Sequence, residues 1–424
     1  MKNLFLVSLT LLLFFSCEKQ AALNEVKFKL GRRDLSGVVN TWQTLSDGSS
    51  FSNYAAFDTS WNYLYPWGSD HNGSARMYGS STDHSHIFLN SDSSLTLMAT
   101  RQADSTPSTS SPYLPIKFHS GTVYSKYQVN INSAYPYWEL SGNFMAPTTQ
   151  GTWPAFWATG ATVYPPESDI MEIKGTTSVW QNTLDSLGHW QTVLTTVATA
   201  PTVWHNYKVS FNLVQGATGT WTDSVDCIYY IDNVITAVHR AKHFANKAMN
   251  IIIDMQMEGG SGTYVAAADT INMKAKNVIL RKGTTPFDPA AWYEIINRST
   301  SQIIAVPNAS TTEGAALMQH TWQGGIEQQW EITGATGSNV AITNRNSNQV
   351  MAIGSASLAP GAAVIQWDWL GGNEQQWVIT SIGGGYYEII NSNSGLAMTL
   401  SGNAIVQSSY TGSTAQQWEI IRLL

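Results

Sequence analysis

The segment PPESDIMEIKG (residues 165–175) carries three carboxylates at a spacing that a regular β-strand does not explain. Side chains alternate between the two faces of a strand, so Glu167 and Asp169 share a face. The next residue on that face is a methionine, and the third carboxylate, Glu172, follows one position later. A β-bulge inserts one extra residue and restores the facing of everything beyond it. We therefore predict a bulge near Ile170–Met171 that turns the three carboxylates to one face.

Carboxylates grouped in this way suit chemistry on a glycosidic bond. A retaining double displacement needs two carboxyl groups about 5–5.5 Å apart. Glu167 would attack the anomeric carbon, and Glu172 would protonate the leaving oxygen and then deprotonate water. Asp169 would hydrogen-bond the nucleophile. Because three crowded carboxyl groups cannot all ionise easily, we expect one pKa among them to be raised, which suits the acid.

The composition is that of an extracellular β-rich protein. Lys and Arg number 22 against 29 Asp and Glu, which gives a net charge of −7. No basic block occurs, which argues against nucleic acid or a strongly anionic polymer as the main partner. The 17 Trp and 18 Tyr residues fit either core packing or platforms for sugar rings.

No metal or cofactor is predicted. Calcium takes about six to eight oxygens, usually from a loop, and a strand with apolar residues between its acids does not supply them. The sequence contains no Cys/His cluster typical of zinc and no Gly-rich phosphate loop.

The first 17 residues predict export. Lys2 precedes an apolar run, Leu4–Phe15, that is too short to span a membrane and is followed by Ser16 and Cys17. The segment resembles a bacterial lipoprotein signal in which Cys17 carries the lipid, and an ordinary cleaved signal with an incidental cysteine is the alternative. We expect a protein that is lipid-anchored to the bacterial outer membrane or cell surface, or secreted, and that meets a membrane only through its anchor. The other cysteine, Cys227, is predicted to be a small buried hydrophobe.

Five segments follow from the pattern along the chain. Residues 1–17 form the signal and residues 18–37 a tether. Residues 38–283 consist of short alternating runs separated by turn signals, which predict an all-β sandwich or barrel. Residues 284–291 contain two prolines and are predicted to be a linker, and residues 292–424 contain an internal repeat.

The repeat indicates a β-trefoil. Three units of about forty residues share similar openings and a Gln-Gln-Trp ending, and each is too short to close a core alone. The endings are EQQWEI (residues 327–332), EQQWVI (residues 374–379) and AQQWEI (residues 415–420). They resemble those of the ricin-type lectin family, also called family 13 carbohydrate-binding modules. That resemblance makes Trp330, Trp377 and Trp418 core residues.

Sugar binding by the trefoil is an open alternative to a purely structural role. The candidates for sugar contacts are His320 in MQHTWQGG, and Trp367 and Asp368 in IQWDWLGG. A ricin-type site has an aspartate early in each repeat, and alanines stand at that place in our alignment. These alanines are Ala305, Ala352 and Ala397.

The segment at residues 38–283 resembles glycoside hydrolase family 16 through the pattern ExDxxE at Glu167–Glu172. Neighbouring stretches stand in the order typical of that family. They are SGTVYSK (residues 120–126), YPYWELSGNF (residues 135–144), GTWPAFWATG (residues 151–160), WHNYKVSF (residues 204–211) and YYIDN (residues 229–233). The resemblance implies a concanavalin-like β-sandwich, or jelly roll, with an open cleft, and an endo-acting retaining enzyme. It makes Glu167 the nucleophile, Asp169 its helper and Glu172 the acid/base.

Five further residues are candidates for the cleft. Trp153 and Trp157 precede the carboxylate strand, and the resemblance makes Trp157 a floor residue, with a core tryptophan as the alternative. His205 is predicted to hydrogen-bond substrate, or else to be a structural histidine. Arg76 and Glu258 are predicted at the cleft edge, or else on a solvated surface.

Two classes of function remain open at this stage. The first is an endo-acting retaining β-glycosidase acting on a polysaccharide. We place β-1,3-glucan of the laminarin type first because the bulged motif and WPAFW (residues 153–157) resemble β-1,3-glucanases, or laminarinases. The predicted cleft segments are poor in Arg and Lys, which favours a neutral polymer over a sulfated galactan. A β-agarase, a porphyranase or another β-galactanase is the alternative within this class. The second class is a surface lipoprotein that binds glycans and has lost catalysis. In either case we expect a monomer.

Overall fold

The computed structural model describes residues 41–423 except 217–219, 266–267 and 335–337. These residues form two compact units, at residues 41–286 and 287–423. The predicted signal, the lipidated Cys17 and the tether lie outside the described residues. None of the helices in the described ranges is both long and apolar enough to cross a membrane.

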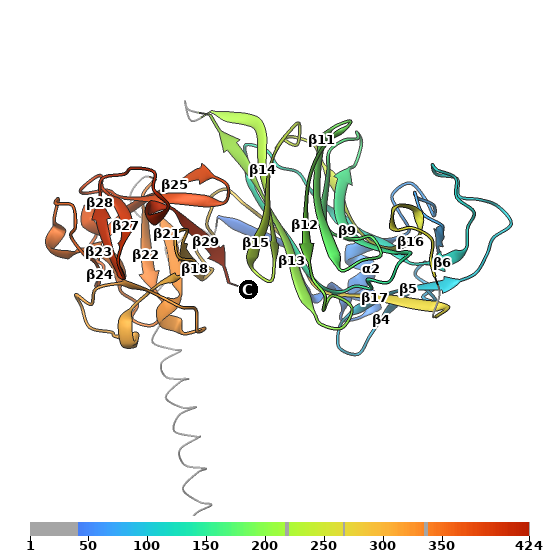
Figure 1. The fold of residues 1–424 in the computed structure, drawn as a ribbon, viewed down its shortest axis with the longest axis horizontal. Helices are drawn as coiled ribbons and strands as arrows, with labels where there is room; N and C mark the ends of the chain where they lie inside the picture. Colours follow the sequence, from blue (N-terminus) through green and yellow to red (C-terminus); the bar gives the residue numbers. More distant parts are fainter. Residues whose placement is uncertain (1–40, 217–219, 266–267, 335–337, 424) are drawn as a thin grey trace, which may run out of the picture. The chain divides into compact units, whose positions relative to one another are not determined.

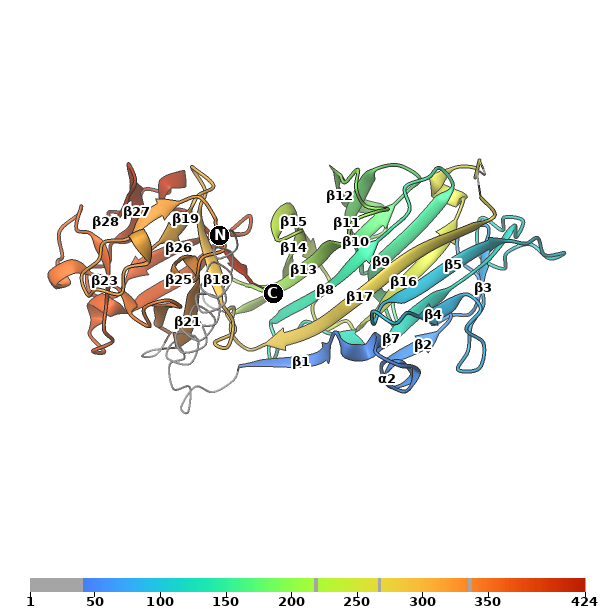
Figure 2. The same cartoon turned by 90° about the horizontal axis from the view of Figure 1, so that it is seen from below.

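The first unit is built from two antiparallel sheets with one short helix, α2, at Tyr54–Ser60 (Figures 1 and 2). Among the described residues, one sheet has ten strands in the order β15-β14-β13-β8-β17-β5-β6-β3, with β1 beside β17 and β4 beside β5. Its strands are β1 (Trp42–Asp47), β3 (Ala75–Met77), β4 (Ile87–Leu89), β5 (Leu95–Arg101), β6 (Phe118–Ser120), β8 (Tyr137–Met145), β13 (His205–Gln215), β14 (Trp221–Ile231), β15 (Val234–Lys242) and β17 (Thr270–Gly283). Only the β3–β6 pair is parallel within this described sheet.

The second sheet of this unit has seven described strands in the order β12-β11-β10-β9-β16-β7-β2. They are β2 (Trp61–Tyr63), β7 (Thr122–Val129), β9 (Thr152–Gly160), β10 (Glu167–Ile173), β11 (Ser178–Ser186), β12 (His189–Thr196) and β16 (Met249–Met257). Two short 3-10 turns, η1 (Ser49–Phe51) and η2 (Gly259–Ser261), complete the unit. The arrangement confirms the predicted all-β sandwich.

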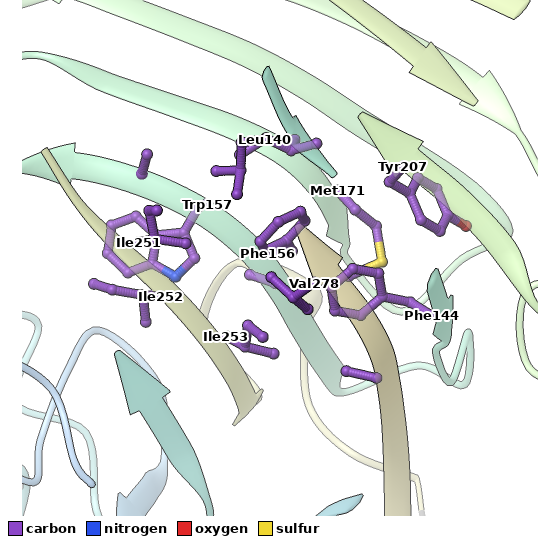
Figure 3. Close-up of a cluster of buried hydrophobic side chains, with 14 of the residues drawn as sticks. Leu140, Phe144, Phe156, Trp157, Met171, Tyr207, Ile251, Ile252, Ile253 and Val278 are labelled. Carbon is purple, nitrogen blue, oxygen red and sulfur yellow. The ribbon is translucent and has the colours of Figure 1, made fainter. Parts of the chain in front are cut away.

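Apolar side chains from both sheets meet in one core. Phe144 of β8 and Phe156 of β9 pack with ring centroids 4.7 Å apart, which joins the two layers. Figure 3 shows Met171 of β10 pointing toward the same ring of Phe144, with Val278 of β17 nearby. Cys227 is fully buried in this core, and burial raises the pKa of its thiol, as predicted for a packing residue.

The predicted bulge is present in β10. The register of β10 against β11 shifts between Asp169 and Glu172, and against β9 between Asp169 and Met171. Ile170 and Met171 are both fully buried. The extra residue therefore goes into the core, and the three carboxylates are left on the opposite face.

The second unit is a β-trefoil of twelve described strands, four for each repeat. The first repeat has β18 (Tyr293–Asn297), β19 (Ile303–Ala305), β20 (Met318–His320) and β21 (Trp330–Gly334). The second has β22 (Val340–Asn344), β23 (Val350–Ile353), β24 (Val364–Trp367) and β25 (Trp377–Gly383). The third has β26 (Tyr386–Asn391), β27 (Ala397–Ser401), β28 (Ala404–Ser408) and β29 (Trp418–Arg422). The 3-10 turns are η3 (Pro307–Ala309), η4 (Ile326–Gln328), η5 (Gly354–Ala356), η6 (Asn373–Gln375) and η7 (Thr414–Gln416).

The three repeat tryptophans are core residues, as predicted. Trp330, Trp377 and Trp418 have no exposed surface. Each indole Nε1 donates to a backbone carbonyl of its own repeat at 3.0–3.1 Å, so the buried donor is satisfied. The acceptors are the carbonyls of Ile304, Met351 and Met398.

These bonds also correct the alignment of the third repeat. The residue after each acceptor carbonyl is Ala305, Ala352 and Thr399 in turn, so our placement of Ala397 in this set was wrong by two positions. The Thr399 hydroxyl accepts a hydrogen bond from Gln416 Nε2 at 3.0 Å. The shift arose because the third repeat was aligned on its alanine and not on the strand register.

Trp377→Ala should lower the free energy of unfolding by about 3–5 kcal/mol, because it leaves a large cavity and an orphaned carbonyl. Trp322→Ala is the matched control, since Trp322 lies in the same unit with 39% of its surface exposed. The control should change stability by about 1 kcal/mol or less. Denaturant unfolding followed by fluorescence measures both, and equal effects of the two substitutions would contradict a core role for Trp377.

Candidate active site

A cleft of about 1030 Å³ lies over the carboxylate face of the seven-stranded sheet. Glu167, Asp169 and Glu172 line it together, so the structure brings the predicted trio to one place. The other lining residues are Trp67, His71, Asn72, Ser111, Trp153, Ala155, Trp157, Thr159, Gly160, Tyr164, Lys174, Trp180, Asn182, Trp190, Thr192, Asp254 and Gln256. They come from strands on both sides of β10, from the loops that flank β10, from the segment after β2 and, for Ser111, from the loop between β5 and β6.

Glu172 is held by three donors. Trp153 Nε1 donates to its Oε1 at 2.7 Å. Asn182 Nδ2 donates to its Oε2 at 2.9 Å, and Lys174 Nζ lies 3.1 Å from the same oxygen. Trp153, predicted for the cleft, thus lies there and orients the carboxyl group at the end of the trio.

Asn182 joins two members of the trio. Its Nδ2 also donates to Asp169 Oδ2 at 2.8 Å, so one amide group bridges Asp169 and Glu172. Asn182 lies on β11 directly opposite Asp169 in the β10–β11 register. Sequence analysis missed this residue, because its place depends on how β11 pairs with β10 and no local motif marks that register.

Burial and crowding raise the pKa values of two of the carboxyl groups. The pKa of Glu167 rises to about 8, first because burial disfavours its charge and then because of the charge on Glu172. The pKa of Asp169 is raised well above its usual range by burial and by the charges of both glutamates. We expected one raised pKa within the trio, which would suit the acid; burial and crowding raise the pKa values of both Glu167 and Asp169.

On the β16 side of the trio, Trp157 belongs to an aromatic cluster. Its Nε1 donates to Asp254 Oδ2 at 3.1 Å, and the hydroxyl of Tyr65 donates to the same oxygen at 3.1 Å. The His71 ring stacks on Trp157 with centroids 5.6 Å apart, and Trp67 lies 6.1 Å from Trp157. Trp157 thus lines the cleft, although only 6% of its surface is exposed.

On the β11–β12 side, further aromatic residues line the cleft. Lys174 Nζ lies 4.6 Å from the centre of the Trp180 ring and 5.7 Å from that of Trp153. Trp190 on β12 and Tyr164 before β10 are about half exposed, at 48% and 52%. Sequence analysis did not select Trp180, Trp190, Tyr164 or Trp67, although the abundance of tryptophan was a general signal for such platforms.

Two residues that were predicted at the cleft edge, Arg76 and Glu258, instead form ion pairs in the scaffold around the cleft. Arg76 does not line the cleft, and its guanidinium contacts Asp70 at 2.8 Å and Asp104 at 2.8 Å. Asp70 directly precedes His71, so its ion pair with Arg76 helps to hold the segment that contains His71 in place. Glu258 is also outside the lining; it is 6% exposed and forms an ion pair with Lys117 at 2.8 Å. The cleft-edge prediction was wrong for both residues, because local charge partners hold them in the scaffold.

The cleft prediction was also wrong for His205. This residue starts β13 in the ten-stranded sheet, on the layer that does not carry the trio. Its Nδ1 pairs with Asp232 Oδ2 at 2.7 Å and its Nε2 with Thr199 Oγ1 at 2.8 Å. Both ring nitrogens are engaged within the protein, which fits the alternative of a structural histidine.

The trefoil candidates lie on its surface. His320 and Asp368 are exposed and Trp367 is partly buried. Gln328 Nε2 donates to the Thr321 carbonyl at 2.9 Å, and Gln375 Nε2 donates to the Asp368 carbonyl at 2.6 Å. The repeat glutamines therefore fix the loops that carry these candidates.

Within the described ranges, no group of three or more His, Cys, Asp or Glu side chains is placed to hold a metal ion.

Comparison with known proteins places the chain in a family. A galactan endo-beta-1,3-galactanase from Flammulina velutipes is 36% identical over 231 residues, which cover 54% of this chain and 86% of that protein. The chain belongs to glycoside hydrolase family 16. Its C-terminal part matches the family described as ricin-type beta-trefoil lectin domain-like over residues 286–367 and 371–423. The protein is thus a family 16 glycoside hydrolase with an appended ricin-type domain.

Solved structures similar to this family 16 enzyme include two glycanases and a designed trefoil. The laminarinase catalytic domain from Thermotoga maritima is 16% identical, with a TM-score of 0.44, covering 57% of this chain and 99% of that one. A GlcNAcα1-4Gal releasing endo-β-galactosidase from Clostridium perfringens is 13% identical, with a TM-score of 0.42, covering 91% and 97%. The designed three-fold symmetric protein ThreeFoil is 34% identical, with a TM-score of 0.30, covering 31% and 99%.

Asp254→Asn should make stability less dependent on pH. Burial raises the pKa of Asp254 to about 7, so the folded state holds a proton that the unfolded state releases from about pH 4 upward. The stability that protonated Asp254 contributes is fully present below the pKa of this group in the unfolded state. It is lost as pH rises through about 7, the pKa in the folded state. An asparagine oxygen can still accept from Trp157 and Tyr65.

Between about pH 5 and about pH 8 the free energy of unfolding should therefore fall less in the variant than in the parent, by about 3 kcal/mol. Urea unfolding at a series of pH values measures the difference. Parallel curves for the two proteins would show that Asp254 is ionised throughout the range.

Proposed function

We propose that this enzyme is an endo-acting, retaining β-1,3-galactanase. The observation that carries the proposal is the bulged strand β10, which turns Glu167, Asp169 and Glu172 into one cleft within a sandwich related to a β-1,3-galactanase. The similarity to that enzyme supports galactan as the substrate and replaces β-1,3-glucan as our first choice. β-1,3-Glucan remains the second candidate, because WPAFW at residues 153–157 resembles the sequence of laminarinases, and its Trp153, Ala155 and Trp157 line the same cleft.

The trio supplies the two steps of a double displacement. An oxygen of Glu167 forms a bond to the anomeric carbon while Glu172 gives its proton to the glycosidic oxygen, and the leaving chain departs. Glu172 then takes a proton from water, the water oxygen bonds the same carbon, and Glu167 is released. Burial and mutual repulsion keep at least one proton on the trio near neutral pH, and this is the proton that the first step delivers through Glu172.

Aromatic residues on both flanks of β10 support endo action. Trp67 and Trp157 lie on the β16 side, and Trp180 and Trp190 lie on the β11–β12 side. A polymer crossing the sheet therefore finds stacking surfaces before and after the bond that is cleaved. This arrangement suits cleavage within a chain better than removal of single end units.

The charge of the cleft favours a neutral polymer. Lys174 is the one Lys or Arg among the described lining residues, and it is already paired with Glu172 and placed over two indole rings. A sulfate or carboxylate on the sugar would meet the carboxyl trio and Asp254 without a free cation. We therefore propose unsubstituted galactan over porphyran-like sulfated polymers.

The trefoil and the N-terminus extend the proposal. We propose that the trefoil retains the enzyme on polysaccharide through loops such as that of Trp367 and Asp368; a chain ending at residue 286 should be retained less on insoluble galactan. We also propose export with a lipid on Cys17, acting as a monomer at the bacterial outer membrane or cell surface, or after secretion. The mass of the mature N-terminal peptide tests the anchor.

Release of oligosaccharides from β-1,3-galactan, laminarin and agarose, compared side by side, tests the proposed activity. Glu167→Ala and Glu172→Ala should each lose nearly all turnover, by at least about a thousandfold, while the melting temperature stays close to that of the parent. Asp269→Ala is the matched control, because Asp269 is 81% exposed and does not line the cleft. NMR of the first product should show the β-anomer, as a retaining mechanism requires.

Products from laminarin alone would move the substrate to β-1,3-glucan. Products from none of the three polymers, or products that persist in Glu167→Ala, would refute the proposed reaction.

A further inference from the structure

The segment between β2 and β3 places His71 at the cleft wall. The proposed reaction assigns no role to this histidine. His71 lines the cleft beside Trp67, an indole with 47% of its surface exposed. Their ring centroids lie 5.2 Å apart. The Tyr65 ring stacks on Trp67 at 5.2 Å and 4° and covers part of it. The exposed part of the indole offers a stacking surface for a sugar ring, and His71 lies beside this indole.

The His71 ring is held by packing and not by hydrogen bonds. It stacks on Trp157 at an interplanar angle of 19°, and it lies 5.3 Å from Tyr65 at 53°. In the part of the chain that the structure describes, no group hydrogen-bonds either ring nitrogen of His71. Its polar atoms are therefore unused although its ring is fixed.

The surroundings make this ring rigid. Trp157 and Tyr65 are both tied to Asp254 Oδ2 at 3.1 Å. The backbone carbonyl of His71 accepts a hydrogen bond from Ser108 Oγ at 3.1 Å. Little rotamer freedom is then lost when a ligand meets the imidazole, so a hydrogen bond made there costs little entropy.

The imidazole is also neutral at ordinary pH. Burial lowers the pKa of His71 to about 4. A neutral imidazole has one N–H donor and one nitrogen acceptor, which matches a hydroxyl group, since a hydroxyl can both donate and accept. A cation at this place would instead select for an anionic group.

We propose that His71 is a specificity-determining residue that hydrogen-bonds a hydroxyl of the neutral hexose unit stacked on Trp67. This inference rests on the proposed function, because it takes a polysaccharide as the ligand of the cleft. It adds the recognition of one sugar unit on the β16 side of the trio, at a distance from the bond that is cleaved. His71 thus acts on binding and not on bond cleavage.

His71→Phe tests the proposal, since phenylalanine keeps a flat ring for stacking and removes both polar nitrogens. On soluble β-1,3-galactan the variant should raise KM by about tenfold to a hundredfold and change kcat less, as expected for loss of a hydrogen bond in a site that orders a sugar hydroxyl. His71→Gln, whose amide donates and accepts, should recover part of the loss. A merely structural histidine would not give this split between KM and kcat.

His84→Phe is the matched control. The His84 ring also stacks on an aromatic residue, Tyr54 at 3.8 Å, but it does not line the cleft. Its KM should stay within about twofold of the parent. If phenylalanine at position 71 lowers the melting temperature, His71→Leu removes the same nitrogens in a smaller side chain. A KM within twofold of the parent for a folded His71→Phe or His71→Leu would overturn the proposal.

Binding separates this inference from the proposed reaction. Tryptophan fluorescence can follow a β-1,3-linked galactotetraose on the inactive Glu167→Ala chain, with and without His71→Phe. Weaker binding with His71→Phe supports the role of His71 even if the parent cleaves no polymer. Equal affinity overturns it even if the parent is an active galactanase, and so does the absence of binding to the Glu167→Ala chain.

Discussion

The one-residue bulge in β10 is the constraint on which the site depends. Without it, the alternation of a strand would place Glu172 on the core side, where a carboxyl group without partners is costly. With it, Ile170 and Met171 fill the core and Glu172 reaches Trp153, Lys174 and Asn182. The same local irregularity therefore satisfies the packing of the sandwich and assembles three carboxyl groups on one surface.

The electrostatics of the cleft follow from that crowding. Glu172 receives three donors, whereas Glu167 and Asp169 have fewer and respond to burial with raised pKa values. The proton that remains on the trio is a consequence of placing like charges in a poorly solvated site. Asp254 follows the same principle, because two donors hold it but no cation contacts it.

Sequence reasoning succeeded where a local pattern dictates the structure. The spacing of Glu167, Asp169 and Glu172 was enough for the bulge, and the repeat was enough for the trefoil. The core role of its three tryptophans followed from the resemblance to the ricin-type family. Sequence reasoning failed where a partner from a distant segment decides the role. Arg76 forms ion pairs with Asp70 and Asp104, and His205 lies on the sheet that does not carry the trio.

Asn182 and the segment with Trp67 and His71 escaped prediction for a related reason. Asn182 reaches the trio only through the register of β11 against β10. The loop after β2 is held at the cleft by contacts with distant segments, among them the bond from Tyr65 to Asp254, which is 189 residues away in the chain. No hydrophobic periodicity or motif within the loop predicts that contact, so the local sequence contains little information about it.

The position of Arg76 in the structure nevertheless explains how the charge of the cleft wall beside Trp67 and His71 is set. Its guanidinium is bound by Asp70, whose other contacts include the backbone N–H of Thr109 at 2.8 Å. The cation is thus used to fix the wall and is kept away from the ligand, while the groups that face the ligand on this side are rings and a neutral imidazole. A wall of this kind gains affinity from stacking and hydrogen bonds and offers nothing to an anionic substituent. The placement of the Arg76 charge in the scaffold, more than the scarcity of charge in the sequence, is what supports the proposed preference for a neutral sugar.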